Sequence, residues 1–457
     1  MKRNQQDLTN GPLLSGIIAY TVPIILTSVL QLLFNAADLG VVGRFRGSLA
    51  VGAVGVTGAI TNLIVNLFIG LSIGAGVSVA HAIGAKQDKQ LHRLIHTSMF
   101  VALVGGAALT IIGVSCSGLF LRLMDTPADI LPLSTTYMRI YFCGMTFTMV
   151  YNFCASILRA AGDTKSPLLY LTIAGVLNVV LNLFFVVVCG MSVAGVALAT
   201  IISQAVSAVL VVRALMRRTD GCHLDLGEIL PHKAQLLRII RIGLPAGIQG
   251  CLFSISNVII QSSINSFGDT VVAGSAAAAN IEGFVYVAMN AFYQTTINYT
   301  GQNVGAHRYD RVKKIVLLCS ICVTITGILL GGGAFLAGKP LLSIYITDSP
   351  EAIAYGITRL MFIGLPYFLC GLMEVSTGGL RGMGASLAPM IISVLGVCGI
   401  RLGWIYTIFR DPRFHSLESL FFSYTISWTI TLIIQFIAFV VVYRRHVKRF
   451  KAGALQP

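Results

Sequence analysis

The stretch Leu158-Arg159-Ala160-Ala161-Gly162, followed by Pro167, returns later in the chain as Leu380-Arg381-Gly382-Met383-Gly384, followed by Pro389. The shift is constant, because 381 − 159 and 389 − 167 both equal 222. The same shift joins three further pairs of identical residues: Pro23 and Pro245, Asn35 and Asn257, and Gly52 and Gly274. A period of this length is too long for a solenoid unit and indicates a duplicated half-protein.

The composition is that of a membrane protein. Hydrophobic residues make up 56% of the chain and charged residues 11%, with a mean hydropathy of +0.83. Soluble domains usually hold about 45–50% apolar and about 25% charged residues. Apolar runs long enough to cross a bilayer recur from end to end. The sequence predicts twelve spans, near 16–40, 49–80, 94–118, 131–158, 167–189, 193–215, 238–266, 271–300, 313–337, 352–380, 388–408 and 418–443.

The formal charge of +15 does not indicate nucleic-acid binding. Most Lys and Arg residues fall on segments that are cytoplasmic if the amino terminus is inside, which is the positive-inside bias of membrane proteins. We therefore expect both termini in the cytoplasm, and an even number of spans agrees with this. No nucleic-acid partner is expected.

The longest polar stretch between spans divides the chain. It predicts an amino-terminal lobe over 1–215, a cytoplasmic linker over 216–237, a carboxy-terminal lobe over 238–451 and a tail over 452–457. Six spans in each lobe give both lobes the same orientation, related by an axis along the membrane normal. Such duplicated halves are typical of carriers that bind between the halves, and a pore is disfavoured. Pro23 lies within the first span and is either a hinge or a static kink.

Ionisable and amide side chains inside the spans are the candidates for function. A charge at bilayer depth costs about 2.5–3.5 kcal/mol or more and usually lines a pathway. The candidates are Asp38, Glu282, Glu374 and Arg401. Arg359, by contrast, is expected near the outer surface, where a long side chain can snorkel.

Asn178 and Asn182 lie four residues apart, hence on one helix face, and Thr200 in the next span can approach them. With Asp38 they offer a carboxylate, two amide oxygens and a hydroxyl. This set suits a hard cation such as Na⁺, and it also suits a proton, which a buried carboxyl group takes up readily. The alternatives are hydrogen bonding between helices for the Asn pair and, for Asp38, a cap or a partner for Arg44 or Arg46.

Several motifs, in this order on twelve spans, carry a family resemblance. They are Leu32-Leu33-Phe34-Asn35-Ala36-Ala37-Asp38 with Val42-Gly43-Arg44, Leu158-Arg159-Ala160-Ala161-Gly162-Asp163-Thr164, Leu177-Asn178-Val179-Val180-Leu181-Asn182 and Gly195-x-Ala197-x-Ala199-Thr200. The chain resembles the multidrug and toxic compound extrusion (MATE) family of cation-coupled antiporters over nearly its whole length. Asn280-Ile281-Glu282-Gly283-Phe284 is similar to its bacterial branches.

The resemblance implies an all-α membrane fold with two pseudo-symmetric six-helix lobes around a V-shaped central cavity. It implies export of lipophilic organic cations or drugs in exchange for Na⁺ or H⁺ by rocker-switch alternating access. Asp38 matches the family's first-helix acid, Pro23 its kink, and Asn178, Asn182 and Thr200 its amino-lobe cation site. It further implies a monomer in the bacterial cytoplasmic membrane, in contact with lipid.

The chain also departs from the family pattern. Many relatives carry Asp where this chain has Asn182, no acid stands near Asn257 in span 7, and another expected acid falls near Cys370, one turn from Glu374. The family's carboxy-lobe Na⁺ site is therefore not expected in its usual form. The candidates for a substrate cavity are Glu282, Glu374, Asn257 and Arg401. Internal pairing is the alternative, above all of Glu374 with Arg401 or Arg381.

We therefore expect a secondary active multidrug antiporter and no enzyme. No catalytic residue and no cofactor are expected beyond the coupling ion H⁺ or Na⁺, and the one possible metal is Na⁺ at Asp38. A lipid-linked oligosaccharide flippase is the alternative, although a more basic cavity is expected of one. An integral-membrane enzyme ranks lower, because the sequence has no HExxH, GxSxG or Asp-rich metal motif.

Overall fold

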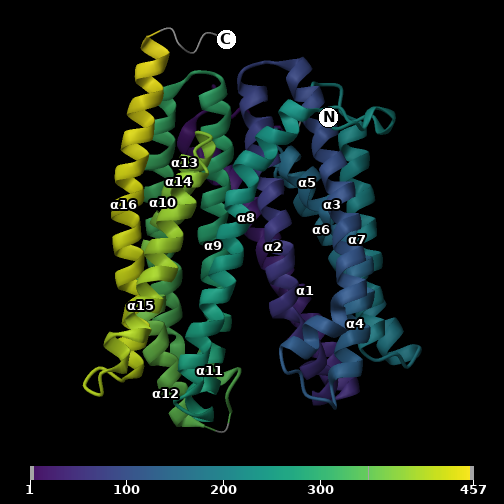
Figure 1. The fold of residues 1–457 in the computed structure, drawn as a ribbon, viewed down its shortest axis with the longest axis vertical. Helices are drawn as coiled ribbons and strands as arrows, with labels where there is room; N and C mark the ends of the chain where they lie inside the picture. Colours follow the sequence, from purple (N-terminus) through teal and green to yellow (C-terminus); the bar gives the residue numbers. More distant parts are fainter. Residues whose placement is uncertain (1–4, 348, 453–457) are drawn as a thin grey trace. The chain divides into compact units, whose positions relative to one another are not determined.

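The computed structural model describes residues 5–347 and 349–452, and all regular structure in this part of the chain is helical (Figure 1). The α-helices are α1 (Leu13–Arg46), α2 (Ser48–Gly84), α3 (Asp88–Leu123), α4 (Leu131–Cys143), α5 (Met145–Ala160), α6 (Lys165–Leu183), α7 (Val193–Met216), α8 (Lys233–Asn265), α9 (Asp269–Gly305), α10 (Tyr309–Leu336), α11 (Gly338–Ser343), α12 (Pro350–Arg359), α13 (Tyr367–Gly382), α14 (Leu387–Ser393), α15 (Ile400–Tyr406) and α16 (Leu417–Lys451). The described residues also form three π-helices, η2 (Phe184–Val188), η4 (Leu360–Gly364) and η5 (Val394–Gly399), and two 3₁₀-helices, η3 (Leu226–Glu228) and η6 (Ile408–Arg410).

Within the described part of the chain, eleven helices or continuous helix runs are long and apolar enough to cross a membrane. A twelfth span is completed by α4 and α5, which are bent by 48° at their junction. The expected all-α membrane fold is thus confirmed, and the count agrees with twelve predicted spans when the bent pair is one of them. Of the predicted tail, residues 453–457 lie outside the described part of the chain.

The described chain forms two compact units that are not consecutive in sequence. The first unit holds Leu26–Cys251 and the short amino-terminal segment that ends at Asp7, and the second holds Leu8–Ile25 and the chain from Leu252 onward. The boundaries therefore fall inside α1 and α8, each of which contributes to both units. The polar stretch 216–237 belongs wholly to the first unit.

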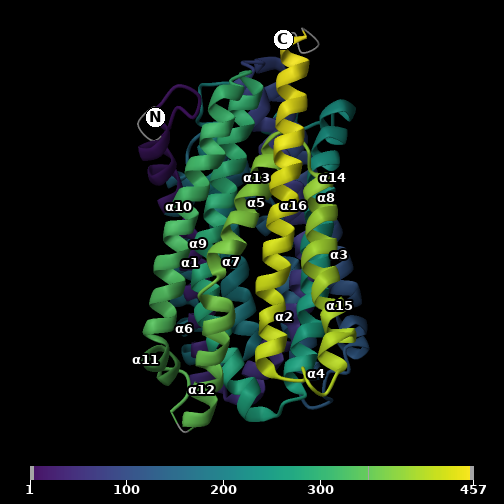
Figure 2. The same ribbon diagram turned by 90° about the vertical axis from the view of Figure 1, so that its left-hand side faces the viewer.

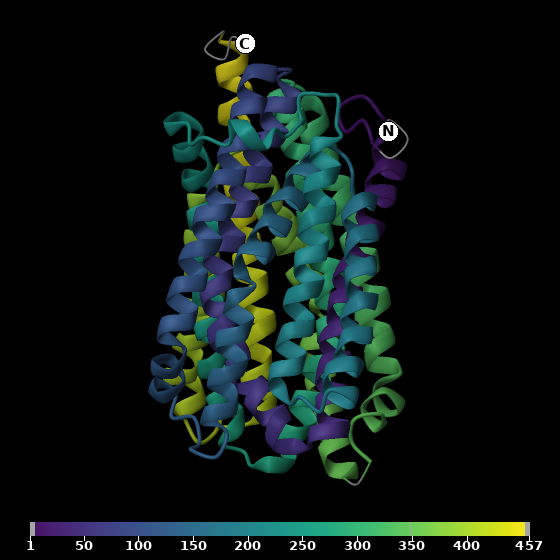
Figure 3. The ribbon, with the colours of Figure 1, turned by 90° about the vertical axis from the view of Figure 1, so that its right-hand side faces the viewer.

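Each unit is built around one central helix. In the first unit α5 packs against α2, α3 and α7, and these helices run along it in Figure 3. In the second unit α13 packs against α9, α10 and α16, as Figure 2 shows. The duplication relates these two sets helix by helix, so each half of the sequence folds around the corresponding helix.

The local backbone repeats as well. Gly162 and Gly384, which the sequence repeat relates, have φ values of 87° and 83°. Lys86 and His307, each of which follows a Gly-Ala pair, have φ values of 54° and 55°. At Gly162 glycine is required twice over, because the left-handed conformation disfavours a side chain and a Cβ atom there would collide with the carbonyl oxygen of Gln6. The repeat seen in the sequence is therefore also a repeat of turns.

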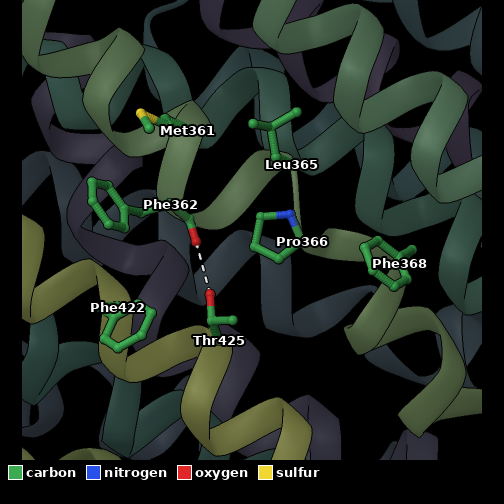
Figure 4. Close-up of a pocket in the computed structure, with 7 residues that line it drawn as sticks. All are labelled: Met361, Phe362, Leu365, Pro366, Phe368, Phe422 and Thr425. Carbon is green, nitrogen blue, oxygen red and sulfur yellow. Dashed lines mark hydrogen bonds between the residues drawn. The ribbon is translucent and has the colours of Figure 1, made fainter.

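Corresponding spans break at corresponding places. The α4–α5 bend lies at Gly144, and Pro366, its equivalent in the second half of the sequence, interrupts the matching span between η4 and α13. Proline has no N–H, so the carbonyl oxygen of Phe362 loses its partner in the helix. Thr425 Oγ1 on α16 donates a hydrogen bond of 3.0 Å to that oxygen, at the edge of a shallow apolar pocket (Figure 4). A side chain from a neighbouring helix thus makes the break tolerable inside a membrane.

Glycines on α2 allow another close approach, within the first unit. Gly70 and Gly74 face Gly243 and Gly247 on the first part of α8, and a Cβ atom at Gly74 would collide with the backbone of that helix. Small residues spaced four apart are how membrane helices bring their backbones together.

Candidate functional site

The four predicted cation-site residues lie together in the first unit. Asp38 comes from α1, Asn178 and Asn182 from α6, and Thr200 from α7. Asn182 Nδ2 donates a hydrogen bond to Asp38 Oδ1 and a second one, of 3.2 Å, to Asn178 Oδ1. Asn178 Nδ2 in turn donates to Thr200 Oγ1 at 3.4 Å, and Thr200 Oγ1 donates to the carbonyl oxygen of Val196 at 3.0 Å. The spacing of four residues on α6 makes this series of hydrogen bonds possible, because it places both amides on one face of the helix.

This network ends on the Asp38 carboxylate, which is half-buried, whereas the two amides are buried. Asn182 is fully buried, and its Oδ1 atom accepts no hydrogen bond from the described residues. A buried amide oxygen without a donor is an unfavourable arrangement for a folded protein unless a water or a cation satisfies it. The site therefore offers the Asp38 carboxylate to a small cation or a proton, while the Asn182 amide presents its Nδ2 atom to that carboxylate and leaves its own oxygen without a donor among the described residues.

Two tyrosines near Asp38 were not predicted. Tyr137 and Tyr141 on α4 both lie close enough to interact electrostatically with the Asp38 carboxylate. Their rings are stacked, with centroids 5.9 Å apart and planes inclined by 17°. The sequence signal was the spacing of four, but aromatic residues are ordinary in membrane helices, so it did not stand out.

Glu282 on α9 lies in a buried ion pair in the second unit. Arg359 on α12 donates from Nε to Glu282 Oε1 at 3.0 Å and from Nη2 to Oε2 at 2.9 Å, while its Nη1 donates to Ser275 Oγ at 2.8 Å. Glu282 is 5% exposed and Arg359 8%. The expectation that Arg359 snorkels at the outer surface is therefore wrong, because the carboxylate of α9 holds its guanidinium inside the protein.

Glu374 on α13 is buried in the second unit and makes no ion pair within 4.0 Å among the described residues. Arg381, two turns further along the same helix, attracts it electrostatically. The Arg381 guanidinium is engaged elsewhere, because its Nη1 donates to the Tyr293 hydroxyl on α9. The alternative of internal pairing thus survives for Arg381 only as a longer-range attraction.

Arg401 on α15 does not pair with Glu374 in the described structure. Its Nε donates to Ser427 Oγ at 2.9 Å, and its guanidinium lies 3.8 Å from the ring centroid of Tyr424 and 5.4 Å from that of Trp428. Aromatic faces of α16 thus take the place of a carboxylate. Asn257 on α8 is exposed, and so is its repeat partner Asn35 on α1.

The duplication preserves the fold but not the polar network. The repeat carries the four network positions of the first unit, in order, onto Ile260, Ile400, Trp404 and Phe422. None of these four side chains offers an oxygen ligand. Among its described residues, the second unit therefore has no counterpart of the Asp38 network at the equivalent positions, and its buried charges are arranged differently.

Pro23 lies inside α1, close to the point where that helix passes from the second unit to the first, between Ile25 and Leu26. Beside it, Thr21 Oγ1 lies 2.7 Å from the carbonyl oxygen of Ile17 and 2.8 Å from Thr295 Oγ1. The helix is thus held by α9 on one side of the proline.

Comparison with known proteins agrees with the fold and the repeat. The MatE family model matches twice, over residues 23–184 and 245–407. The probable multidrug resistance protein YpnP of Bacillus subtilis (strain 168) is 30% identical over 400 residues, which cover 86% of this chain and 88% of that protein. The probable multidrug resistance protein NorM of Thermotoga maritima is 27% identical over 393 residues, which cover 84% and 83%.

A solved structure has the same fold. It is the outward-facing conformation of a multidrug resistance MATE family transporter of the MOP superfamily, with a TM-score of 0.90 and 21% sequence identity. The alignment covers 98% of this chain and 99% of that one. Together with the two-fold family match, these likenesses show that the chain belongs to the MatE family and is a multi-pass membrane protein of the MATE multidrug efflux type.

Proposed function

We propose that this protein exports lipophilic organic cations or drugs by antiport against H⁺ or Na⁺, with Asp38 as the coupling group. The observation that carries the proposal is the network of Asp38, Asn182, Asn178 and Thr200, with its one removable charge. The two relatives described above bear the name probable multidrug resistance protein, which supports the substrate class.

The coupling follows from differential binding. A cation or proton that enters from outside neutralises Asp38 and changes what the Asn182 amide is bonded to. If the outward-open state holds the ion better and the inward-open state holds the drug better, each ligand releases the other. The cycle then needs one site whose charge is present in one half of the cycle and absent in the other.

We favour a proton as the coupling ion. Asn182 turns its amide N–H group, a donor, toward Asp38. For Na⁺ to bind both side chains, the amide would have to turn its oxygen toward the carboxylate, since Na⁺ takes oxygen ligands. A proton on the carboxyl group requires no such rotation, because the other carboxyl oxygen can carry it.

We further propose that the protein works as a monomer in the bacterial cytoplasmic membrane, with both termini in the cytoplasm. The distribution of Lys and Arg supports this orientation. Its partners are then the exported organic cation and the surrounding lipid, with no nucleic acid and no cofactor.

The test uses proteoliposomes that contain the purified protein and ethidium as the transported cation. A pH gradient and a Na⁺ gradient are imposed separately. We expect transport driven by the pH gradient and lost in Asp38→Asn, whose amide keeps the size of the side chain but carries no charge. Transport driven equally by either gradient, or undiminished in a folded Asp38→Asn protein, contradicts the proposal. The flippase alternative is tested by fluorescent lipid in the same vesicles.

A further inference from the structure

A second polar cluster lies in the first unit, at the amino-terminal end of α3 and away from the Asp38 network. His92 and His96 stand one turn apart on one face of α3, and Glu228 in η3 belongs to the polar stretch between α7 and α8. One ring nitrogen of each histidine and one carboxylate oxygen of Glu228 all lie within 4.8 Å of one another. His92 Nε2 and Glu228 Oε2 are 3.0 Å apart.

The hydrogen bonds of His96 define its tautomer. The ring is fully buried, with Nδ1 2.7 Å from the carbonyl oxygen of His92 and Nε2 3.0 Å from the backbone nitrogen of Asp225. Because the Asp225 N–H group can only donate, Nε2 must accept, so Nδ1 carries the hydrogen and donates to the carbonyl. A ring N–H held by a carbonyl, with the lone pair on the other nitrogen, is the arrangement that orients metal-binding histidines.

We propose that His92, His96 and Glu228 form a binding site for a divalent transition-metal ion such as Zn²⁺, which ties α3 to the polar stretch between α7 and α8. Two imidazoles and a carboxylate, with water as the fourth ligand, are a common ligand set for this ion. Two histidines four residues apart on a helix present their rings to one ion.

The distances allow such a site after small side-chain rotations. Bonds of about 2.0–2.2 Å place the ligand atoms of a tetrahedral ion about 3.4 Å apart. The His92–Glu228 separation of 3.0 Å is already near this value, and these two side chains are 44% and 58% exposed. They are therefore free to turn toward His96, and the same exposure gives the ion a path into the site.

Binding requires one exchange at His96. His96 Nε2 must give up the hydrogen bond that it accepts from the Asp225 N–H group, so one neutral hydrogen bond is exchanged for one bond to the metal. The surrounding segment is otherwise held in place, since Cys222 and Leu224 are buried and the backbone nitrogen of His232 donates to Thr97 Oγ1 at 3.2 Å. The carboxylate ligand is thus already held near the histidines, so less conformational entropy is lost when the ion binds.

The test is metal binding to the purified, tag-free full-length protein, with Co²⁺ as a visible probe and Zn²⁺ as its competitor. We expect one equivalent of Co²⁺ with a tetrahedral absorption spectrum, displaced by Zn²⁺. His92→Ala and Glu228→Gln should each lower the affinity by about tenfold or more. His223→Ala removes a histidine of the same stretch outside the cluster and should leave binding unchanged.

Two results overturn the proposal. One is the absence of stoichiometric binding, which leaves the cluster as a hydrogen-bonded attachment only. The other is binding that neither His92→Ala nor Glu228→Gln weakens. The exposed residues are substituted, rather than buried His96, so that the variants keep the fold. Because the readout is metal binding and not transport, its failure leaves the antiport proposal untouched.

Discussion

Removing one partner of the buried Glu282–Arg359 pair should destabilise the second unit far more than removing both. Arg359 makes two hydrogen bonds to the carboxylate, of 2.9 and 3.0 Å, and a third to Ser275 of 2.8 Å. In Arg359→Leu the Glu282 carboxylate stays buried without its counter-charge, a loss of about 3–5 kcal/mol. In Glu282→Leu the Arg359 guanidinium likewise stays buried without its counter-charge, and the loss of stability should be similar. The double variant replaces both groups by apolar side chains and should lie within about 1 kcal/mol of the parent protein.

The assay is equilibrium unfolding of the purified protein and its three variants in detergent micelles, read as a double-mutant cycle. Ethidium efflux from proteoliposomes is measured alongside. The double variant should unfold like the parent protein and still export ethidium, because this carboxylate is held by a fixed cation and not by the substrate. Additive losses in the double variant would refute the reasoning about the pair. A stable double variant that no longer binds ethidium would show that Glu282 recognises substrate.

Three further predictions concern packing and charge. Gly74→Ala should destabilise the first unit, because the added Cβ atom collides with the α8 backbone. Gly58→Ala, whose Cβ atom would have no neighbour within 4 Å, should instead stabilise its helix by up to about 1 kcal/mol. Thermal unfolding of the two variants separates the effects, and equal shifts of their melting temperatures would contradict the close crossing of α2 and α8. Thr425→Val should lower the free energy of unfolding by about 1 kcal/mol, because it leaves the Phe362 carbonyl oxygen without its donor. Thr358→Val should lower it less, since the Thr358 hydroxyl bonds only within its own helix. Unfolding of both variants in detergent checks this prediction, and equal losses of stability would contradict it. Burial alone would raise the pKa of Asp220, but the hydrogen bonds and the positive charge of Arg218 outweigh burial and lower this pKa overall. The ionised Asp220 carboxylate therefore stabilises the fold at neutral pH, and this contribution is lost as the pH falls below about 4. Asp220→Asn should therefore lower the melting temperature at pH 7 and change it less at pH 3, and an equal effect at both values would contradict this linkage.

The spans and the Asp38 network could be predicted because their signals are local or periodic. Apolar runs locate the helices, the constant shift relates the two halves, and a spacing of four places Asn178 and Asn182 on one face. When the neighbouring spans pack, these positions bring the two amides close to Asp38. The polar network follows from positions along three helices, which the sequence pattern specifies well.

The pairing of buried charges could not be predicted in the same way. Glu282 and Arg359 are 77 residues apart, and their meeting depends on how α9 packs on α12 and on the π-helical turn that follows Arg359. Arg401 turns to Tyr424 and Trp428 because of the course of η5 into α15, which no periodicity reveals. The sequence shows which buried charged groups need a partner, whereas the packing of the helices selects that partner.

The most direct test of the central claim is proton release during substrate binding. Ethidium is added to the detergent-solubilised protein in weakly buffered solution, and the released protons are counted with a pH indicator. If Asp38 is the group that exchanges its proton for the drug, the parent protein should release up to one proton per bound ethidium. Asp38→Asn resembles the protonated state, so it should need more ethidium to reach the same occupancy and should release no proton when ethidium binds. Equal proton release by the folded Asp38→Asn variant would contradict the claim that Asp38 is the coupling group.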